Sequence, residues 1–433
     1  MKQDLPFIPQ PAPIKADRCK TDDRQPLPDL ATVLRKPRGE APIYGIYSWG
    51  VDYPVYGKAI EEIGFKCLRT GGRPFTDAEF EPIARGGLNA MMTVGLARSG
   101  FDSDEAFVQG NIDNALEKLR RYGPNGTFFT DHPDVPYHPI RYIEIFNEPN
   151  FGYMVPNQTD IKEKARLYTL LQTRIYAPIK AEFPEVRVLG FGAGGASAAD
   201  VGFIRLCCET NPEIYHTMDI LSTHPYVDPI SPFAWMGWLK YSIASGYAEI
   251  RKLLAAGGVP DMPVWYTELG WFIRPDEGGF FPTCEKGNDR IEQAAFNTQV
   301  YALGMRLGVE RITTMYIMDT DNCNPGFVDR DGTLRPSALA VQNMIRLMPD
   351  PKLTGALLDG EDNRYAYVFE AAPGGEEVTM VFHANAPAEI TIPWSEATAE
   401  VTDMLGNTAT VAVTDGRLTL DAGPCPLYVR HCH

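Results

Sequence analysis

This chain of 433 residues has few cysteines, fewer positive than negative charges, and no long hydrophobic run. Eight cysteines are too few for a disulfide scaffold at this length, and none stands in the C-x-x-C spacing of a zinc or redox site. No apolar stretch has the length of a membrane span. The formal net charge of −16 repels phosphate backbones and anionic lipids. These absences exclude nucleic acid and membrane as expected partners. They favour a neutral small molecule and are compatible with a homo-oligomer.

The N-terminal segment lacks the pattern of a secretory signal. Its first residues, MKQDLPFIPQPAP, contain no apolar core of about 7 to 15 residues, which favours a cytoplasmic location unless a leader has been trimmed. Residues 1–40 are rich in proline and charge, so we expect this extension to lie over the surface or to stay mobile.

Most of the cysteines are expected to be free thiols. Cys67 falls in a predicted strand, and Cys207 and Cys208 fall in a predicted helix, where a small buried hydrophobic side chain is the expected role. Cys284 and Cys323 lie in predicted loops, and a disulfide between them stays open.

Hydrophobic residues make up 44% of the chain, enough for a sizeable core, and from residue 43 short apolar runs alternate with helical patterns. The apolar runs cover residues 43–49, 65–70, 89–94, 142–146, 186–191, 220–223, 264–267 and 312–318. The helical patterns cover residues 55–63, 77–84, 104–122, 161–183, 198–209, 243–256, 289–307 and 336–348. This alternation predicts an α/β fold, a (β/α)₈ TIM barrel over residues 41–349.

After residue 349 the pattern changes to short alternating runs separated by turn signals. These runs cover residues 365–369, 378–383, 389–393, 410–413, 418–420 and 427–429. Turn signals such as Pro373-Gly374-Gly375 and Asp415-Gly416 separate them. We therefore predict a small all-β domain, a β-sandwich, over residues 350–433.

Two of the predicted barrel strands end on a glutamate. The run RYIEIF breaks at Asn147-Glu148-Pro149, and because Pro149 has no backbone N–H the strand pairing should stop there. The run VWYTEL carries Glu268 at its end. Active sites of (β/α)₈ barrels lie at the C-terminal ends of the strands, so Glu148 and Glu268 should face each other across the mouth of the barrel.

Paired carboxyl groups are the machinery of glycoside hydrolysis, in which one protonates the leaving oxygen. In the retaining mechanism the second, about 5 to 5.5 Å away, attacks the anomeric carbon. Asn147 could contact the sugar 2-hydroxyl, and Arg69 could keep the nucleophile ionised. His224 and Tyr226, at the end of the sixth strand, could orient that nucleophile. Flat apolar faces for a sugar ring come from three tryptophans: Trp49, Trp265, which alternation makes a core candidate, and Trp271.

At these positions the chain resembles the retaining glycoside hydrolases of clan A. The shared features are Asn-Glu-Pro after the fourth strand, a glutamate after the seventh, an arginine after the second and His-x-Tyr after the sixth. The segments VTDMLGN, DGRLTL and PLYV are similar to the β-sandwich that follows the barrel in families 39 and 30. The resemblance covers residues 43–430. It implies Glu148 as acid/base, Glu268 as nucleophile, Asn147 as the 2-hydroxyl contact, and Arg69, His224 and Tyr226 as supporting residues.

One position departs from this pattern. Many clan members place a tryptophan at the end of the eighth strand, whereas this chain reads Tyr316-Ile317-Met318-Asp319. We expect no flat platform there, and we expect Asp319 to hydrogen-bond a sugar hydroxyl in its place.

Two other function classes stay open. The segment GFGAGG, residues 190–195, fits the G-x-G-x-x-G dinucleotide-binding signal with Glu209 nearly twenty residues on, which would indicate an NAD-dependent oxidoreductase. That signal normally opens its domain, whereas here four strand-helix units precede it. The glycines are therefore expected to turn the chain out of the fifth strand. A catalytically silent barrel that binds glycans is the second alternative, disfavoured by the presence of both glutamates.

The sequence favours a retaining glycosidase acting on β-linked carbohydrates such as an oligosaccharide or glycoside. We expect no metal and no organic cofactor, since the chemistry needs only the two carboxyl groups. The long loops 130–140 and 272–289 could close the cleft into a pocket, which favours exo action.

Overall fold

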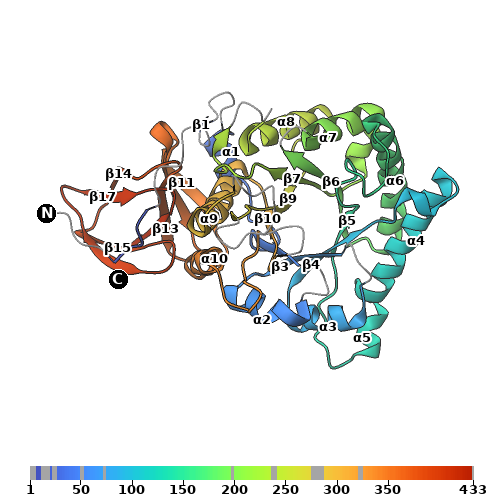
Figure 1. Ribbon diagram of the computed structural model, residues 1–433, viewed down its shortest axis with the longest axis horizontal. Helices are drawn as coiled ribbons and strands as arrows, with labels where there is room; N and C mark the ends of the chain where they lie inside the picture. The colour runs from blue at the N-terminus through green and yellow to red at the C-terminus, as the bar shows by residue number, and fades with distance from the viewer. Residues whose placement is uncertain are drawn as a thin grey trace.

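The computed structural model describes residues 6–10, 20–21, 27–48, 53–71, 75–196, 199–235, 241–274, 287–319 and 325–431. Eight parallel strands form a closed barrel, and each of the eight predicted apolar runs supplies one of them (Figure 1). Around the barrel the order is β10-β2-β3-β4-β5-β6-β7-β9. The strands are β2 (Tyr44–Tyr47), β3 (Cys67–Gly71), β4 (Asn89–Val94), β5 (Tyr142–Ile145), β6 (Arg187–Ala196), β7 (Ile220–Tyr226), β9 (Val264–Leu269) and β10 (Arg311–Met315). The predicted TIM barrel is confirmed.

Helices follow the barrel strands and cover the barrel from outside (Figure 1). The eight predicted helical patterns correspond to α2 (Tyr53–Ile63), α3 (Asp77–Arg85), α4 (Asp104–Tyr122), α6 (Ile161–Glu182), α7 (Ala199–Thr210), α8 (Ile243–Ala256), α9 (Arg290–Leu307) and α10 (Pro336–Leu347). The sequence patterns missed the short helices α1 (Leu30–Leu34) and α5 (Thr127–Asp131) because five residues are too few to show a helical period.

Helix α9 illustrates how tertiary packing overrides amphipathic patterning. Its N-cap Asp289 accepts hydrogen bonds from the backbone N–H groups of Ile291 and Glu292, and Gly308 ends it with a left-handed φ of 81°. Its residues from Glu292 to Leu307 are buried on every side. Such burial is expected for a helix covered by the barrel on one side and by another domain on the other.

The C-terminal part forms two antiparallel sheets. The larger has the order β11-β12-β13-β18-β15-β16 and the smaller pairs β14 with β17. Apolar side chains from both sheets share one core that includes Val381, Ile390, Leu418 and Val429, so the predicted sandwich is confirmed. Its strands are β11 (Lys352–Asp359), β12 (Arg364–Glu370), β13 (Glu377–His383), β14 (Ala388–Pro393), β15 (Thr398–Thr402), β16 (Thr408–Ala412), β17 (Arg417–Ala422) and β18 (Leu427–His431). The sequence patterns missed β11 and β15.

The described parts of the N-terminal extension lie on the rest of the protein. The backbone N–H of Ile8 donates to Asp403 Oδ2 at 2.8 Å, and the Gln10 side chain bonds the backbone of Cys425. A two-residue strand, β1 (Lys20–Thr21), pairs with β8 (Ala234–Trp235). These contacts agree with an extension that drapes over the surface.

The cysteine predictions hold for the described residues. Cys67, Cys207 and Cys208 are buried free thiols. Cys284 and Cys323 lie outside the described residues.

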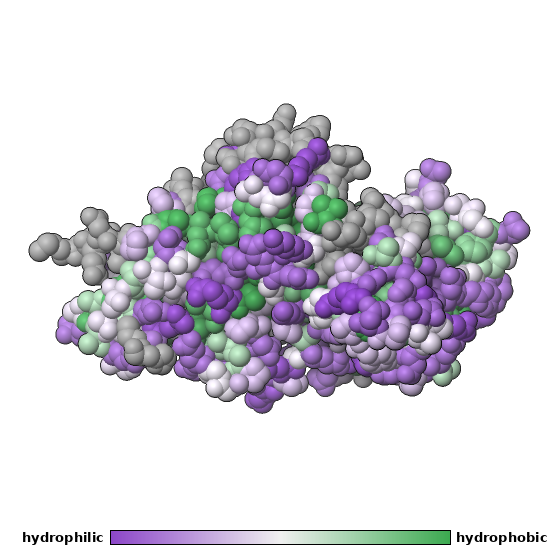
Figure 2. Space-filling model, turned by 90° about the horizontal axis from the view of Figure 1, so that it is seen from below, coloured by the Kyte–Doolittle hydropathy of each residue, from purple (hydrophilic) through white to green (hydrophobic). Residues whose placement is uncertain are grey.

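No helix in the described part of the chain combines the length and apolar character needed to cross a bilayer. Figure 2 shows a face on which hydrophilic residues predominate over the barrel side, with apolar residues in smaller groups among them.

One local prediction is wrong. Residues 190–195, the GFGAGG segment, lie within the ten-residue strand β6 and do not turn the chain out of it. The pairing of β6 with β7 shifts register between Phe191 and Ala193, and Gly192 has a φ of 47°. The glycines therefore form a bulged strand rather than a loop.

Candidate active site

Glu148 lies just beyond the end of β5, where the backbone leaves the strand in an unusual conformation. Phe146 and Glu148 both have left-handed φ angles, 72° and 45°. Two backbone hydrogen bonds hold this turn, from Phe146 N–H to Val94 O at 2.8 Å and from Glu148 N–H to Gly192 O at 2.9 Å. Non-glycine residues rarely adopt this region, and they do so mostly where the surrounding structure enforces it at a functional site. The sequence NEP thus ends the strand as predicted.

Glu268, near the end of β9, has both carboxylate oxygens bound. Its Oε1 accepts a hydrogen bond from the Tyr226 hydroxyl at 2.6 Å, and its Oε2 lies 2.5 Å from Nη1 of Arg69. Burial and the neighbouring charge of Glu268 raise the pKa of Tyr226 well above its ordinary value, so the phenol keeps its proton and acts as a donor. The side chain of Glu268 is therefore oriented and charge-compensated.

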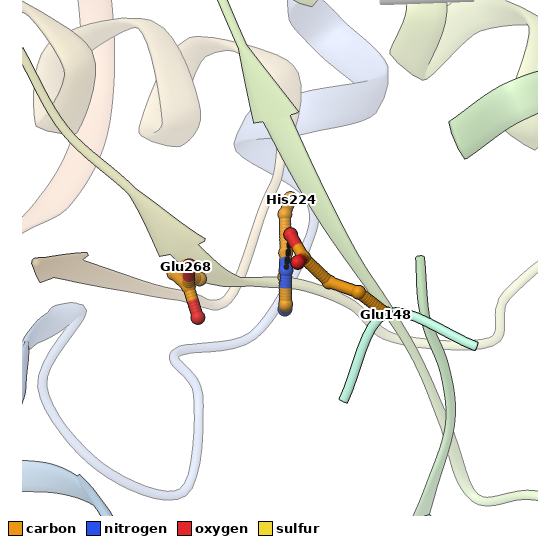
Figure 3. A group of neighbouring side chains, drawn as sticks. All are labelled: Glu148, His224 and Glu268. Atoms are coloured by element: carbon orange, nitrogen blue, oxygen red, sulfur yellow. Dashed lines mark hydrogen bonds and ion pairs between the residues drawn. The ribbon is translucent and has the colours of Figure 1, made fainter. Parts of the chain in front are cut away.

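The structure brings the two glutamates together around His224 (Figure 3). One oxygen of Glu148, one oxygen of Glu268 and one ring nitrogen of His224 all lie within 4.8 Å of one another. Nδ1 of His224 is 3.1 Å from Glu148 Oε1, and Nε2 is 3.1 Å from the Thr267 hydroxyl. The expectation that His224 orients Glu268 is therefore corrected, because its ring contacts Glu148. Both ring nitrogens are engaged, so the imidazole is held in one orientation.

Arg69 stands beneath the site and is fully buried. Its guanidinium donates to Glu144 Oε2 from Nε at 3.0 Å and from Nη2 at 2.6 Å. Nη2 also donates to Asn147 Oδ1 at 2.7 Å, and the guanidinium carbon lies 4.5 Å from the centre of the Tyr47 ring. Arg69 thus links β3 to both glutamate-bearing strands, since it also binds Glu268.

Glu144 is a site residue that the sequence reasoning missed. It is fully buried on β5, and Thr93 donates to its Oε2 at 2.9 Å. Burial alone would raise its pKa, but the charges of Arg69 and His224 outweigh burial and hold the pKa below the ordinary value. The sequence feature that could have revealed Glu144 is a single acidic residue within an apolar strand, four residues before Glu148. Such a residue needs a buried cation as a partner.

A cavity of about 550 Å³ opens beside the two glutamates. Its wall includes the polar or aromatic side chains of Tyr47, Asn147, Glu148, Glu268 and Tyr316. The rest of the wall is mostly apolar and includes Phe75, Met92, Val94 and Phe146, with Asn114 and Lys118 from α4. This volume is in the range of ligand-binding pockets.

Tyr316 lines the cavity at the end of the eighth barrel strand, where we expected no flat platform. It directly follows β10, lines the cavity, and its ring centre is 5.0 Å from that of Tyr47. The sequence analysis named this tyrosine but gave it no role in the site.

Two predicted substrate contacts are also corrected. Trp271 is 1% exposed, and its indole N–H donates to Ile230 O at 2.8 Å, so no ring face is left for a sugar. Asp319 is 4% exposed and bound by two nitrogens of Arg335, at 2.6 and 3.0 Å, and by the Gly326 N–H. Three hydrogen bonds to the protein thus occupy most of its accepting capacity. Trp265 is buried in the barrel core, and Trp49 lies outside the described residues.

Asp319→Asn is expected to affect stability rather than substrate binding. Among the described residues, the change leaves the buried Arg335 with Asp329 as its one anionic partner, and breaking a buried pair costs about 3 kcal/mol or more. Urea denaturation would measure this loss, and a control, Glu182→Gln, breaks the exposed pair with Arg120 and should cost under about 1 kcal/mol. A large rise in KM with unchanged stability would restore Asp319 as a substrate contact.

The donor atoms of a metal site are present in His224, Glu148 and Glu268. The hydrogen bonds of these side chains fit acid/base catalysis better than metal binding. A histidine and two carboxylates can ligate zinc. Here both oxygens of Glu268 already accept hydrogen bonds, one of them from a guanidinium, and a ring nitrogen of His224 faces Glu148 directly. A cation would have to displace these partners and lie close to the charge of Arg69.

No protein-family model and no curated protein matches this sequence. Solved structures do match. A family 39 glycoside hydrolase from the gut symbiont Bacteroides cellulosilyticus WH2 is 19% identical, with 91% of this chain and 81% of that chain covered and a TM-score of 0.70. A monomeric β-xylosidase from Caulobacter crescentus CB15 is 14% identical, with 90% and 97% covered and a TM-score of 0.57. A family 51 α-L-arabinofuranosidase from Bifidobacterium longum is 14% identical, with 92% and 97% covered and a TM-score of 0.62.

The chain has the fold of the clan A glycoside hydrolases. The resemblance seen in the sequence motifs is confirmed at this level. A barrel of this kind hosts many functions, so the activity has to follow from the side chains at the mouth. In this clan A fold, the GFGAGG segment has no dinucleotide-binding context, because it lies inside a closed barrel rather than before the first helix of an open sheet.

Proposed function

We propose that this protein is a retaining glycoside hydrolase in which Glu148 is the acid/base and Glu268 is the nucleophile. The observation that supports this assignment is the separation of the two carboxylates, which have oxygens within 4.8 Å of each other across one cavity. Retaining enzymes hold their two carboxyl groups about 5 to 5.5 Å apart, whereas inverting enzymes need about 6.5 to 9.5 Å to admit a water.

The two glutamates have different neighbours, which supports different roles. Glu268 accepts hydrogen bonds from a guanidinium and a phenol, as an ionised nucleophile requires. Glu148 contacts the imidazole of His224, which can accept or donate a proton as Glu148 changes its own protonation state. The sugar carbon would be attacked from the Glu268 side and the leaving oxygen protonated from the Glu148 side.

The reaction then follows in two balanced steps. A carboxylate oxygen of Glu268 bonds to the anomeric carbon while the glycosidic C–O bond breaks, and Glu148 gives its proton to the departing oxygen. In the second step Glu148 takes a proton from water, the water oxygen bonds to the anomeric carbon, and the bond to Glu268 breaks. Two inversions at one carbon give net retention.

Asn147 is placed to contact the substrate with a defined end of its amide. Arg69 has only donors, so the Asn147 oxygen faces Arg69 and the NH₂ group is left to donate elsewhere. Asn147 lines the cavity next to both carboxylates. We propose that this NH₂ group hydrogen-bonds the sugar 2-hydroxyl, a contact that strengthens in the transition state.

Glu148→Ala tests the acid/base role through its dependence on the leaving group. General acid catalysis contributes about 10² to 10⁴-fold, so kcat/KM for phenyl or alkyl glycosides should fall by that amount. Dinitrophenyl glycosides need no protonation, and their kcat/KM should fall far less. Glu117→Ala, an exposed glutamate on α4, is the control. An equal loss of kcat/KM for all leaving groups would contradict the acid/base assignment of Glu148. If the unmodified protein binds oligosaccharides but turns none of them over, a catalytically silent glycan-binding barrel would be favoured.

We further propose β-linked substrates and exo action. The β-linkage rests on the motif resemblance, and one of the similar structures is a β-xylosidase while another is an α-L-arabinofuranosidase. Paired α- and β-aryl glycosides of several sugars would therefore be assayed side by side. Oligosaccharides labelled at the reducing end would report exo action as release of single terminal sugars.

A further inference from the structure

We propose that Gly194 and Asn150 are positioning residues for Glu148, so that the glycine-rich strand β6 is part of the acid/base apparatus. This inference rests on the proposed function and deepens it. Neither residue was among the predicted site residues, and the GFGAGG segment was first noticed for a different chemistry.

The first observation is the space at Gly194. A Cβ atom built on this residue would lie 1.9 Å from Oε1 of Glu148, 2.5 Å from its Cδ and 2.7 Å from its Cγ. These separations are far below van der Waals contact. The carboxyl group of Glu148 therefore rests directly against the Gly194 backbone, in volume that any other residue would occupy.

Gly194 is needed for space and not for its backbone angles. Its neighbours Gly192 and Gly195 have left-handed φ angles of 47° and 136°, whereas Gly194 does not. An alanine at 194 would meet no backbone strain of that kind, and the atoms it would displace belong to the end of a flexible side chain. The substitution should therefore move Glu148 while the strand persists.

The second observation is a double hydrogen bond between Asn150 and Gly194. The Asn150 Oδ1 accepts from the Gly194 N–H at 3.0 Å, and its Nδ2 donates to the Gly194 carbonyl oxygen. Asn150 is 5% exposed, and the ammonium of Lys164 donates to its backbone oxygen at 3.1 Å. The side chain thus ties the turn after Glu148 to the residue against which the Glu148 carboxyl group rests.

Together these contacts confine Glu148 from several sides. Its backbone N–H donates to Gly192 O, Gly194 supports one side of its carboxyl group, and His224 binds Oε1. Asn150 then holds the turn and the strand at a fixed separation. A catalytic group displaced by about 1 Å can lose on the order of 10²-fold in rate, so this confinement is a direct contribution to catalysis.

Gly194→Ala should impair the acid/base step selectively. We expect kcat/KM for phenyl and alkyl glycosides to fall by about 10²-fold, with dinitrophenyl glycosides changed only a few-fold, and the pH profile of kcat/KM to shift on the limb that reports the acid. The control is Gly202→Ala on α7, where an added Cβ meets no atom within 4 Å. Thermal unfolding of both variants distinguishes a misplaced Glu148 side chain from a loss of the fold.

Asn150→Asp keeps the size of the side chain but replaces the donor to Gly194 O with a carboxylate oxygen. Because this carboxylate oxygen would face another acceptor, Asn150→Asp should give a selective loss like that of Gly194→Ala, and Asn150→Ala, which only removes the two hydrogen bonds, should give a smaller one. An unchanged dependence on leaving group in Gly194→Ala, or a uniform loss for all substrates together with a lower Tm, would overturn the proposal. If Glu148→Ala itself shows no leaving-group selectivity, the proposed function fails. If Glu148→Ala shows that selectivity and Gly194→Ala does not, only the positioning role fails.

Discussion

Glu268→Ala is expected to reduce turnover of every hydrolysed substrate by about 10⁴ to 10⁶-fold, the range found when a covalent nucleophile is removed. Among the described residues, Glu148 is the one other carboxylate that lines this cavity. Stability should change less, because Arg69 keeps Glu144 as its buried anionic partner. Steady-state kinetics on activated aryl glycosides would measure the loss.

Added azide should restore part of the activity of Glu268→Ala and report its mechanism. The truncated side chain leaves room next to the Arg69 guanidinium, whose positive charge attracts a small anion. Azide would attack the anomeric carbon directly, and a single displacement gives a glycosyl azide of inverted configuration. The same addition to Glu148→Ala should give the opposite anomer, since Glu268 still forms the intermediate. NMR of the products decides between them. Swapped anomers would exchange the two roles, and identical anomers from both variants would refute them.

The barrel and its two glutamates were predictable because both depend on local sequence patterns. Alternating apolar runs and helical periods place the strands, and Pro149 marks where a strand must end. The closure of the barrel then brings the ends of β5 and β9 to the same mouth without any further information.

Side-chain contacts across the site were less predictable because they depend on the direction in which each side chain points. The order of the residues along the chain does not fix that direction. His224 was expected to orient Glu268 because it lies at the end of the sixth strand, yet its ring reaches Glu148. Trp271 follows β9 closely but turns into the packing beside α9, where its ring centre lies 5.9 Å from that of Phe296. Proximity to a strand end does not determine which side of the strand a residue faces.

Glu144 and Asn150 were missed because each pairs with a residue distant in the chain. Glu144 reads as an interruption of an apolar run until its partner Arg69 is known, 75 positions away. Asn150 reads as a turn residue until its bonds to Gly194 are seen. Single-sequence periodicity carries no information on such pairs.

Arg69→Met is expected to be the most damaging substitution for stability and activity together. Arg69 lies between Glu144 and Glu268, with all three side chains almost fully buried. Removing one member of a buried ion network leaves uncompensated charge and costs about 3 to 5 kcal/mol. Turnover should fall as well, because the Glu268 carboxylate loses a charged hydrogen-bond donor and Asn147 loses the donor that fixes its amide.

The stability loss in Arg69→Met should depend on pH in a defined direction. In the native protein, burial opposes ionisation of Glu144, but Arg69 and His224 outweigh it and lower the pKa from its ordinary value of 4.5. A carboxyl group with a depressed native pKa contributes stability that is present above its unfolded pKa and is lost as pH falls through the native pKa. The difference in unfolding free energy between the native protein and Arg69→Met should therefore be largest near neutral pH and shrink below about pH 4.5.

Urea denaturation between pH 7 and pH 3.5 would follow this difference. The control, Arg174→Met, breaks an exposed pair with Glu105 and should cost under about 1 kcal/mol at each pH. The double substitution Arg69→Met with Glu144→Gln removes the buried charge as well as its partner, so it should recover part of the stability lost by Arg69→Met alone. It should not recover turnover, because Glu268 would still lack its guanidinium. A pH-independent loss, or a double variant less stable than Arg69→Met, would show that Arg69 acts through packing and not through its charge.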